Sequence, residues 1–384
     1  MNIAYVTADD PHNLRSWSGL SFYIAESLKP HGAKIHYLGP LVSEVSPTLG
    51  LRRRFWRLFG KRVLEDREPS IVRGRGRQVM EKLKGLDVDL ILATHTELLA
   101  ECETDLPIAY WSDSNFDCML GAYPYFQSLN PCVIRRGHDY ERRALARAGL
   151  VFYACDWARD AAIKTYGIAP EKVKVIPFGA NIQCDRSAAD VDKLIAARPR
   201  DRCQLLFLGK VWERKGGDTA VAVAEELNRS GLPTTLTLIG SQPPEGKSLP
   251  LFVRKTGFIN KSDPAGLKQF NDLIAQSHFL ILPSRAEAFG IVFCEASSFG
   301  VPSLATKVGG IPTAVRDGGN GQTFPLDAPP ADYAAFVRQQ FANYASYEAL
   351  ARSAFREFET RLNWGVSGAT AMGYLRAMLA QRGS

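Results

Sequence analysis

The sequence predicts an α/β protein with two doubly wound domains that face each other across a cleft. Short apolar runs rich in strand-forming residues alternate with amphipathic helical stretches, beginning with "NIAYVTA" at residues 2–8. This alternation is typical of βαβ units in a parallel sheet. It starts again at "CQLLFLGK", residues 203–210, after the turn "PFGAN". A chain of 384 residues is too long for one ordinary core and about right for two domains.

In the first half, each apolar run predicts a buried strand followed by a polar loop. A helical spacing of apolar residues follows the first strand and ends at Gly32. Residues 141–167 predict a helix, a strand and a second helix in succession. The other expected strands are residues 33–39, 88–95, 106–113 and 172–177.

In the second half, the same reading predicts four strands and the helices between them. The strands are expected at residues 203–210, 233–241, 278–284 and 302–306, and the helices at 217–231, 264–277 and 291–299. We therefore expect Rossmann-like domains at 1–180 and 181–362. The final segment, 363–384, is expected to be a helix that crosses back onto the first domain.

The composition predicts a cytoplasmic protein. Hydrophobic residues make up 46% of the chain and charged residues 23%, which is typical of a soluble globular protein. We find no apolar run of membrane-spanning length, and the start lacks the pattern of a signal peptide. The seven cysteines are scattered without a C-x-x-C pair, which argues against a zinc site or a disulfide framework.

One block departs from the otherwise even distribution of the +7 net charge. Residues 51–84 contain twelve basic and four acidic residues, with aromatic residues among the arginines. The block is either a solvated face with a few aromatics in the core, or a surface that docks onto anionic lipid or a phosphorylated acceptor. We expect no nucleic-acid partner. If the block docks onto anionic lipid, we expect the protein to be peripheral on the inner face of the membrane.

Two lysines mark the first loop of the second domain. In "FLGKVWERKGG", Lys210 and Lys215 lie between a strand and a helix, beside glycines that free the backbone amides. In doubly wound sheets the ligand lies beyond the carboxyl ends of the strands. Two ammonium groups at that place suit a diphosphate, although the segment alone is also compatible with an ordinary surface turn.

Two glutamates flank the start of a later helix in the same domain. In "SRAEAFGIVFCEA", Glu287 precedes Gly290 and Glu295 lies one turn inside the expected helix. A carboxylate repels phosphate, but it accepts hydrogen bonds from hydroxyl groups. Two carboxylates on either side of a diphosphate indicate a nucleotide sugar, with ribose at one end and hexose at the other.

These residues resemble the retaining glycosyltransferases of the GT-B fold, family 4. The resemblance rests on the glutamate pair with Phe289-Gly290 between them, on "LGKVWERKGG", and on "VGGIPTAVRDGGNGQTF". It is strongest from about Gly179 to Phe324. It implies transfer of hexose from a UDP- or GDP-sugar, with retention, to a glycan or lipid-linked acceptor, as in lipopolysaccharide or other polysaccharide synthesis. No Asp-x-Asp loop in a suitable context offers a metal site, so we expect the two lysines to take the place of a metal ion.

The resemblance also implies a role for each matching position. Glu295 would hold the ribose and Glu287 a hydroxyl of the donor sugar, while the two lysines would hold the diphosphate. The remaining donor-binding positions are Gly19, Gly257, Phe258, Phe289, Gly290, Ile291 and Val292. Many members have a histidine where this chain has Asp113. We therefore expect Asp113 and His95 to be the first-domain contacts, and we count them with Glu287 and Lys215 as catalytic.

Three other functions remain open from the sequence. One is a sugar-nucleotide epimerase or hydrolase on the same fold, and another is a non-catalytic glycan-binding protein at the membrane surface. An NAD-dependent oxidoreductase is disfavoured, because neither domain opens with G-x-G-x-x-G.

Overall fold

The computed structural model describes residues 1–43 and 47–383, which form two compact units. Unit 1 comprises Met1–Pro177 and Trp364–Ser384, and unit 2 comprises Phe178–Asn363. Each unit has its own parallel sheet and its own buried core. These sheets confirm the predicted class of two doubly wound α/β domains.

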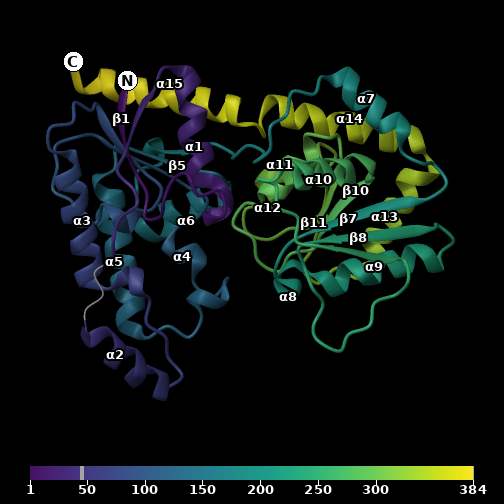
Figure 1. Cartoon of the computed structure of the whole chain (residues 1–384), viewed down its shortest axis with the longest axis horizontal. Helices are drawn as coiled ribbons and strands as arrows, with labels where there is room; N and C mark the ends of the chain where they lie inside the picture. Colours follow the sequence, from purple (N-terminus) through teal and green to yellow (C-terminus); the bar gives the residue numbers. More distant parts are fainter. Residues whose placement is uncertain (44–46, 384) are drawn as a thin grey trace. The chain divides into compact units, whose positions relative to one another are not determined.

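Unit 1 is built on a six-stranded sheet in the order β2-β1-β3-β4-β5-β6 (Figure 1), with every neighbouring pair parallel. The strands are β1 (Asn2–Val6), β2 (Lys34–Tyr37), β3 (Leu90–Ala93), β4 (Ile108–Ser112), β5 (Leu150–Tyr153) and β6 (Val173–Val175). The helices are α1 (Leu20–Leu28), α2 (Pro47–Leu58), α3 (Pro69–Leu83), α4 (Phe116–Met119), α5 (Pro131–Arg147), α6 (Asp156–Tyr166) and α15 (Trp364–Gly383). The central strands are buried throughout, as expected for a parallel sheet covered by helices.

Unit 2 has a second six-stranded parallel sheet, in the order β12-β11-β10-β7-β8-β9. The strands are β7 (Cys203–Leu208), β8 (Thr234–Ile239), β9 (Val253–Gly257), β10 (Phe279–Leu282), β11 (Ser303–Thr306) and β12 (Gly321–Phe324). The helices are α7 (Ala188–Ala197), α8 (Trp212–Lys215), α9 (Gly217–Arg229), α10 (Pro264–Gln276), α11 (Ile291–Ser297), α12 (Ile311–Ala314), α13 (Pro330–Ala342) and α14 (Tyr344–Thr360). Because all strands run in parallel, the loops after β7, β9 and β10 leave the sheet at one edge.

Two strands of unit 2 are not predicted by the sequence. The outermost strands, β9 and β12, lie at the two edges of the sheet. The first is mostly polar and partly exposed, and the second has four residues and begins at a glycine. Neither therefore produces the apolar run by which central strands are recognised.

Helix α15 belongs to unit 1 although it follows unit 2 in the chain. It packs against α1 (Figure 1). The ring of Trp364 stacks on that of Tyr23 with a centroid distance of 6.1 Å. The two helices approach closely at Gly368, since a Cβ atom there would lie 2.0 Å from the carbonyl oxygen of Ser27. Among residues 1–43 and 47–383, no helix is long and apolar enough to cross a membrane.

Candidate functional site

Lys215 and Glu287 form an ion pair beyond the carboxyl ends of the unit 2 strands. Lys215 ends α8 and Glu287 lies in the loop after β10, and their side chains are only 11% exposed. Gly209 leaves room for this lysine, because a Cβ atom there would lie 2.8 Å from Lys215 Cγ. The structure thus brings together two residues that the sequence places 72 positions apart.

The turn after α8 is fixed against the end of β10. Gly216 has a φ of +76°, and a Cβ atom there would lie 2.0 Å from the carbonyl oxygen of Pro283. The amide of Arg285 donates to the carbonyl of Arg214 over 2.7 Å. These contacts fix the backbone of the turn after α8, next to Lys215, and of the loop after β10, which carries Glu287.

Arg214 is a component of this site that the sequence analysis missed. Its guanidinium donates to the carbonyl of Ala286 over 2.9 Å and lies 3.6 Å from the Glu287 carboxylate. The position next to Lys215 in "WERKGG" was the signal available for finding it.

The backbone of Glu287 is held from the opposite side by a glycine pair. Gly310 donates its amide to the carbonyl of Glu287 over 3.1 Å. Gly309, with a φ of +54°, packs so closely that a Cβ atom would lie 2.1 Å from the same oxygen. This contact leaves no room for a side chain at position 309.

Glu295 also has a basic partner, which the sequence analysis missed. The carboxylate is 2% exposed on α11, and Lys261 Nζ lies 2.5 Å from its Oε1. Lys261 follows β9 and is also 5.0 Å from the ring centre of Phe270. The two predicted carboxylates are thus each neutralised by a lysine from another loop.

The first turn of α11 lies between the two glutamates, as predicted. Gly290 is its N-cap with a φ of +91°, and no side chain of the described residues caps it. Ile291 and Val292 are partly buried in that turn. The Phe289 side chain, in contrast, is 1% exposed and packs against Phe178, so it belongs to the core of unit 2.

The remaining predicted residues of unit 2 lie after β7 and β9. Lys210 is exposed, and its Nζ is 5.7 Å from the ring centre of Phe258, itself 65% exposed. Gly257 has a φ of +73° and open space around it. Lys210 thus adds a further positive charge to Arg214, Lys215 and Lys261 at this edge, against two carboxylates. Such an excess suits an anionic ligand that also offers hydroxyl groups.

In unit 1 the structure brings His95 and Asp113 together with Trp17. The rings of Trp17 and His95 lie 4.9 Å apart, and the Trp17 side chain forms a hydrogen bond with Asp113. Burial raises the pKa of Asp113 above its usual range, against the opposing effects of Ser114, His95 and Trp17. A carboxyl group with a raised pKa keeps its proton more readily, as a general acid or base requires. No sequence pattern had indicated Trp17 as a part of this site.

The loop before α1 has an unusual backbone at the predicted residue Gly19. Gly19 has a φ of +82°, and the two residues before it, Trp17 and Ser18, also have positive φ values of 43° and 57°. Left-handed backbone at non-glycine residues costs about 1–3 kcal/mol each and is concentrated at functional loops.

A buried charged cluster supports the loop of His95. Arg67 lies 3.2 Å from Glu97, and Thr96 donates to Glu141 over 2.8 Å. The amide of Phe116, at the start of α4, donates to the same carboxylate. Burial raises the pKa of Glu141 to about 7 despite the opposing charge of Arg67. This cluster fixes the loops after β3 and β4 relative to α5.

Comparison with known proteins shows that part of unit 2 is similar to a known family of enzymes. Residues 202–343 match the family model described as "Glycosyl transferases group 1". A D-inositol 3-phosphate glycosyltransferase of Streptomyces bingchenggensis is 31% identical over 240 residues, covering 58% of this chain and 52% of the relative. A glycogen synthase of Mycobacterium tuberculosis is 32% identical over 218 residues, with 54% and 51% covered. The chain spans about half the length of the curated relatives that it matches.

Solved structures share the fold of the whole chain. Sucrose-phosphate synthase from Thermosynechococcus elongatus has a TM-score of 0.68 at 17% identity, with 99% of each chain covered. Anabaena HepE in complex with UDP-glucose has a TM-score of 0.62 at 18% identity, with 98% of this chain and 100% of that chain covered. At these identities the likeness concerns the GT-B fold.

Proposed function

We propose that this chain is a retaining hexosyltransferase, because residues 202–343 match the family model of the glycosyl transferases group 1. It moves a hexose from a UDP- or GDP-sugar to a glycan or lipid-linked acceptor and needs no metal ion. The observation that carries this proposal is the edge of unit 2, where Lys215 pairs with Glu287 and Lys261 with Glu295. The UDP-glucose held by the Anabaena neighbour supports the donor class.

We propose a role in donor binding for each of the site residues of unit 2. Lys210 and Lys215, with the amides of Gly290, Ile291 and Val292, hold the diphosphate. Glu287 accepts a hydrogen bond from the donor sugar and Glu295 from the ribose, while the backbone at Gly257 and Phe258 runs past the base. Phe289, being buried, acts by supporting the loop.

The reaction breaks the anomeric C–O bond and leaves negative charge on the departing diphosphate. Fixed positive charge where this charge develops stabilises the transition state. Lys210 and Lys215 would provide that positive charge without a metal ion. We propose attack of the acceptor hydroxyl from the face that the diphosphate leaves, which retains configuration, with the diphosphate taking the hydroxyl proton. Asp113 and His95 are the proposed contribution of unit 1.

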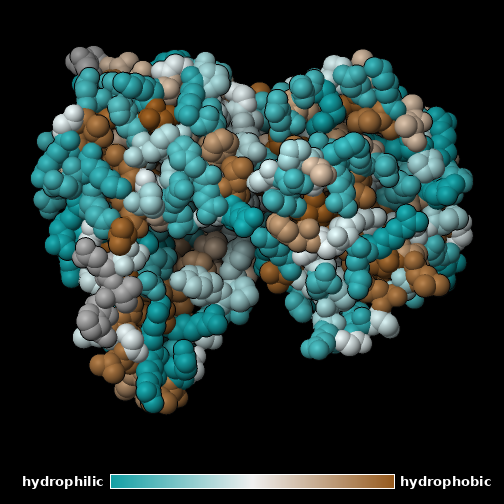
Figure 2. All heavy atoms as spheres, in the orientation of Figure 1, coloured by the Kyte–Doolittle hydropathy of each residue, from teal (hydrophilic) through white to brown (hydrophobic). Residues whose placement is uncertain are grey.

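A membrane surface is the proposed second partner, through α2. Leu51, Phe55, Leu58 and Phe59 are 54–80% exposed, and Figure 2 shows hydrophobic side chains gathered where Figure 1 labels α2. Arg54, Arg57 and Lys61 are exposed in the same segment. Arg52 and Arg53 are instead paired with Glu68 and Glu65 of unit 1.

Apolar side chains flanked by cations match the surface of an anionic bilayer, which attracts both. We therefore propose a cytoplasmic protein that docks peripherally on anionic lipid. Of the block at 51–84, the docking surface is confined to residues 51–61, because Ile71, Val72 and Val79 of α3 are buried in unit 1.

A binding experiment followed by a transfer assay tests the enzymatic proposal. In EDTA, UDP or GDP at a hundred times its Kd should stabilise the protein by about 2.7 kcal/mol, while NAD should not. Stabilisation by NAD alone, or by no nucleotide, would contradict the donor assignment. Consumption of a UDP- or GDP-sugar without any glycosylated product, across glycan and lipid-linked acceptors, would instead support the epimerase or hydrolase.

A further inference from the structure

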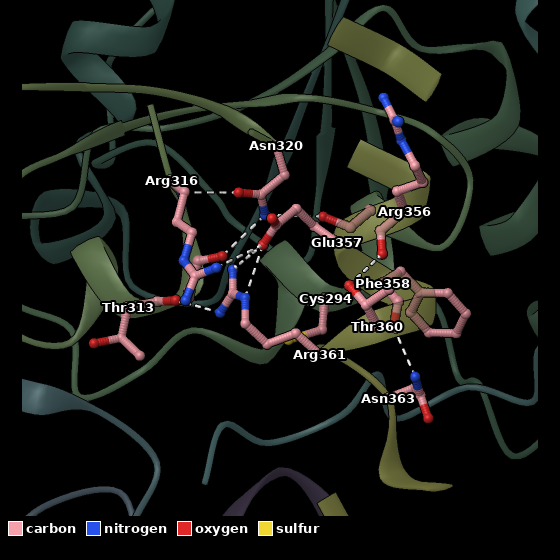
Figure 3. Close-up of polar contacts among 12 residues, drawn as sticks. Cys294, Thr313, Arg316, Asn320, Arg356, Glu357, Phe358, Thr360, Arg361 and Asn363 are labelled. Atoms are coloured by element: carbon pink, nitrogen blue, oxygen red, sulfur yellow. Dashed lines mark hydrogen bonds and ion pairs between the residues drawn. The ribbon is translucent and has the colours of Figure 1, made fainter. Parts of the chain in front are cut away.

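Asn320 is completely buried in unit 2, and its side chain makes three hydrogen bonds. The Nδ2 group donates to Ser297 Oγ over 3.1 Å and to the carbonyl of Ala314 over 2.9 Å. The Oδ1 atom accepts from the amide of Arg316 over 2.8 Å (Figure 3). One side chain thus connects the end of α11, the end of α12 and the loop that precedes β12.

These connections lead to both glutamates of the site, to Glu295 along α11 and to Glu287 through α12 and one backbone hydrogen bond. Ser297 lies two residues after Glu295 on α11. Ala314 ends the four-residue helix α12, whose N-cap, Gly310, donates to the carbonyl of Glu287. Asn320 therefore anchors the helix that carries Glu295 and the helix that supports Glu287.

A neighbouring arginine braces the same helix from outside. Arg361 donates to the carbonyl of Thr313 over 2.6 Å and to Glu357 over 2.7 Å (Figure 3). Glu357 also lies 3.7 Å from Arg316. Helix α12 is thus fixed to α14, and Asn320 adds a direct hydrogen-bonded link between α12 and α11.

We propose that Asn320 is a positioning residue that sets the spacing between Glu287 and Glu295. The inference rests on the function proposed above. Two carboxylates that bind opposite ends of one donor must lie at a distance that matches the length of the donor. A misplacement of about 1 Å can reduce the rate about a hundredfold. Alanine at 320 would remove all three hydrogen bonds, whereas aspartate would place a carboxylate against the Ala314 carbonyl.

The test compares Asn320→Ala with Asn228→Ala. Asn228 is a matched control, because its side chain also makes three hydrogen bonds, to Ala224 and Thr234, and joins α9 to β8 away from the glutamates. At a temperature where both variants are folded, Asn320→Ala should raise the KM for the nucleotide sugar about tenfold or more. Asn228→Ala should leave it within twofold of the wild type.

Ser297→Ala provides a second, milder variant that keeps two of the three bonds. It should weaken UDP or GDP binding severalfold, because it loosens the helix that carries Glu295. If Asn320→Ala does not fold, this variant decides the question. Equal donor affinity in Ser297→Ala and wild type, or equal losses in Asn320→Ala and Asn228→Ala, would overturn the inference. Absence of nucleotide binding by the wild type would instead contradict the proposed function.

Discussion

Lys215 and Glu287 form a largely buried ion pair, with Arg214 3.6 Å from the same carboxylate. Removing one partner of such a pair leaves a charge that is only partly solvated, which costs more than losing an exposed pair. The pair thus keeps the lysine oriented before any ligand arrives. A bound diphosphate would share this lysine with the glutamate.

Glu287→Gln should lower kcat/KM for the nucleotide sugar about 10- to 100-fold, because hydrogen bonds to charged groups contribute about 1.5–3 kcal/mol. The amide keeps the shape of the side chain but cannot neutralise Lys215. Steady-state kinetics checks this. Asp272→Asn is the control, since Asp272 is paired with Lys268 on the exposed face of α10 and should retain wild-type kinetics. Full turnover by Glu287→Gln would exclude the proposed role.

Glu295→Gln should separate recognition of ribose from recognition of phosphate. We expect UDP or GDP to bind about tenfold more weakly, since a charged acceptor for the ribose hydroxyls is lost. Inorganic diphosphate should bind as in the wild type. Lys210→Met should weaken both ligands. Calorimetric titrations provide the affinities, and a parallel loss for diphosphate in Glu295→Gln would contradict the assignment of this residue to ribose.

Neutralising two cations of α2 should weaken binding to anionic vesicles. Each basic residue near such a surface contributes about 1 kcal/mol, so Arg54→Gln with Arg57→Gln should reduce binding about 30-fold. Phe55→Ser with Leu58→Ser should also reduce it. The matched control is Leu251→Ser with Leu326→Ser, two exposed leucines of unit 2. Vesicle co-sedimentation is the measurement, and equal binding by all variants would exclude α2 as the docking surface.

Gly216→Ala should destabilise the protein much more than Gly231→Ala. Both glycines have positive φ values, which cost an alanine about 1–2 kcal/mol. At Gly216 the new Cβ would also meet the carbonyl of Pro283 at 2.0 Å, whereas Gly231 has open space. Urea denaturation of unit 2 should show the difference. Equal midpoints would mean that the α8 turn does not rest on β10 in solution.

Glu141 should make unit 1 less stable as the pH rises. Its pKa is raised from 4.5 to about 7 by burial, so between these values the folded state binds more protons than the unfolded state. The contribution of Glu141 to the free energy of unfolding therefore falls as the pH rises through this range, by about 3 kcal/mol in total above pH 7. Glu141→Gln should remove this dependence. Unfolding measured at pH 5, 6 and 8 should show the wild type losing stability relative to the variant. If the free energy of unfolding of the wild type and of Glu141→Gln changed with pH in the same way, the raised pKa of Glu141 would be contradicted.

The sequence predicted both sheets because their central strands are apolar runs with a clear period. It missed β9 and β12, whose edge positions remove that signal. It located Glu287, Glu295 and both lysines from their spacing around glycines. It could not reveal that Lys261 faces Glu295, because that pairing depends on the register of β9 against β8 and not on any local pattern. Asn320 was missed because its role depends on contacts with Ser297 and Ala314, which no local sequence pattern marks.

The placement of α15 in unit 1 has a consequence for synthesis of the chain. A ribosome makes both sheets and all of unit 2 before it releases the helix that covers α1 through Trp364 and Tyr23. Unit 2 therefore has every residue it needs while unit 1 still exposes part of its apolar surface. Domains usually fold as units in the order in which they are made, but here the domain begun first is finished last. Until then, that uncovered surface is where a chaperone would bind the nascent chain.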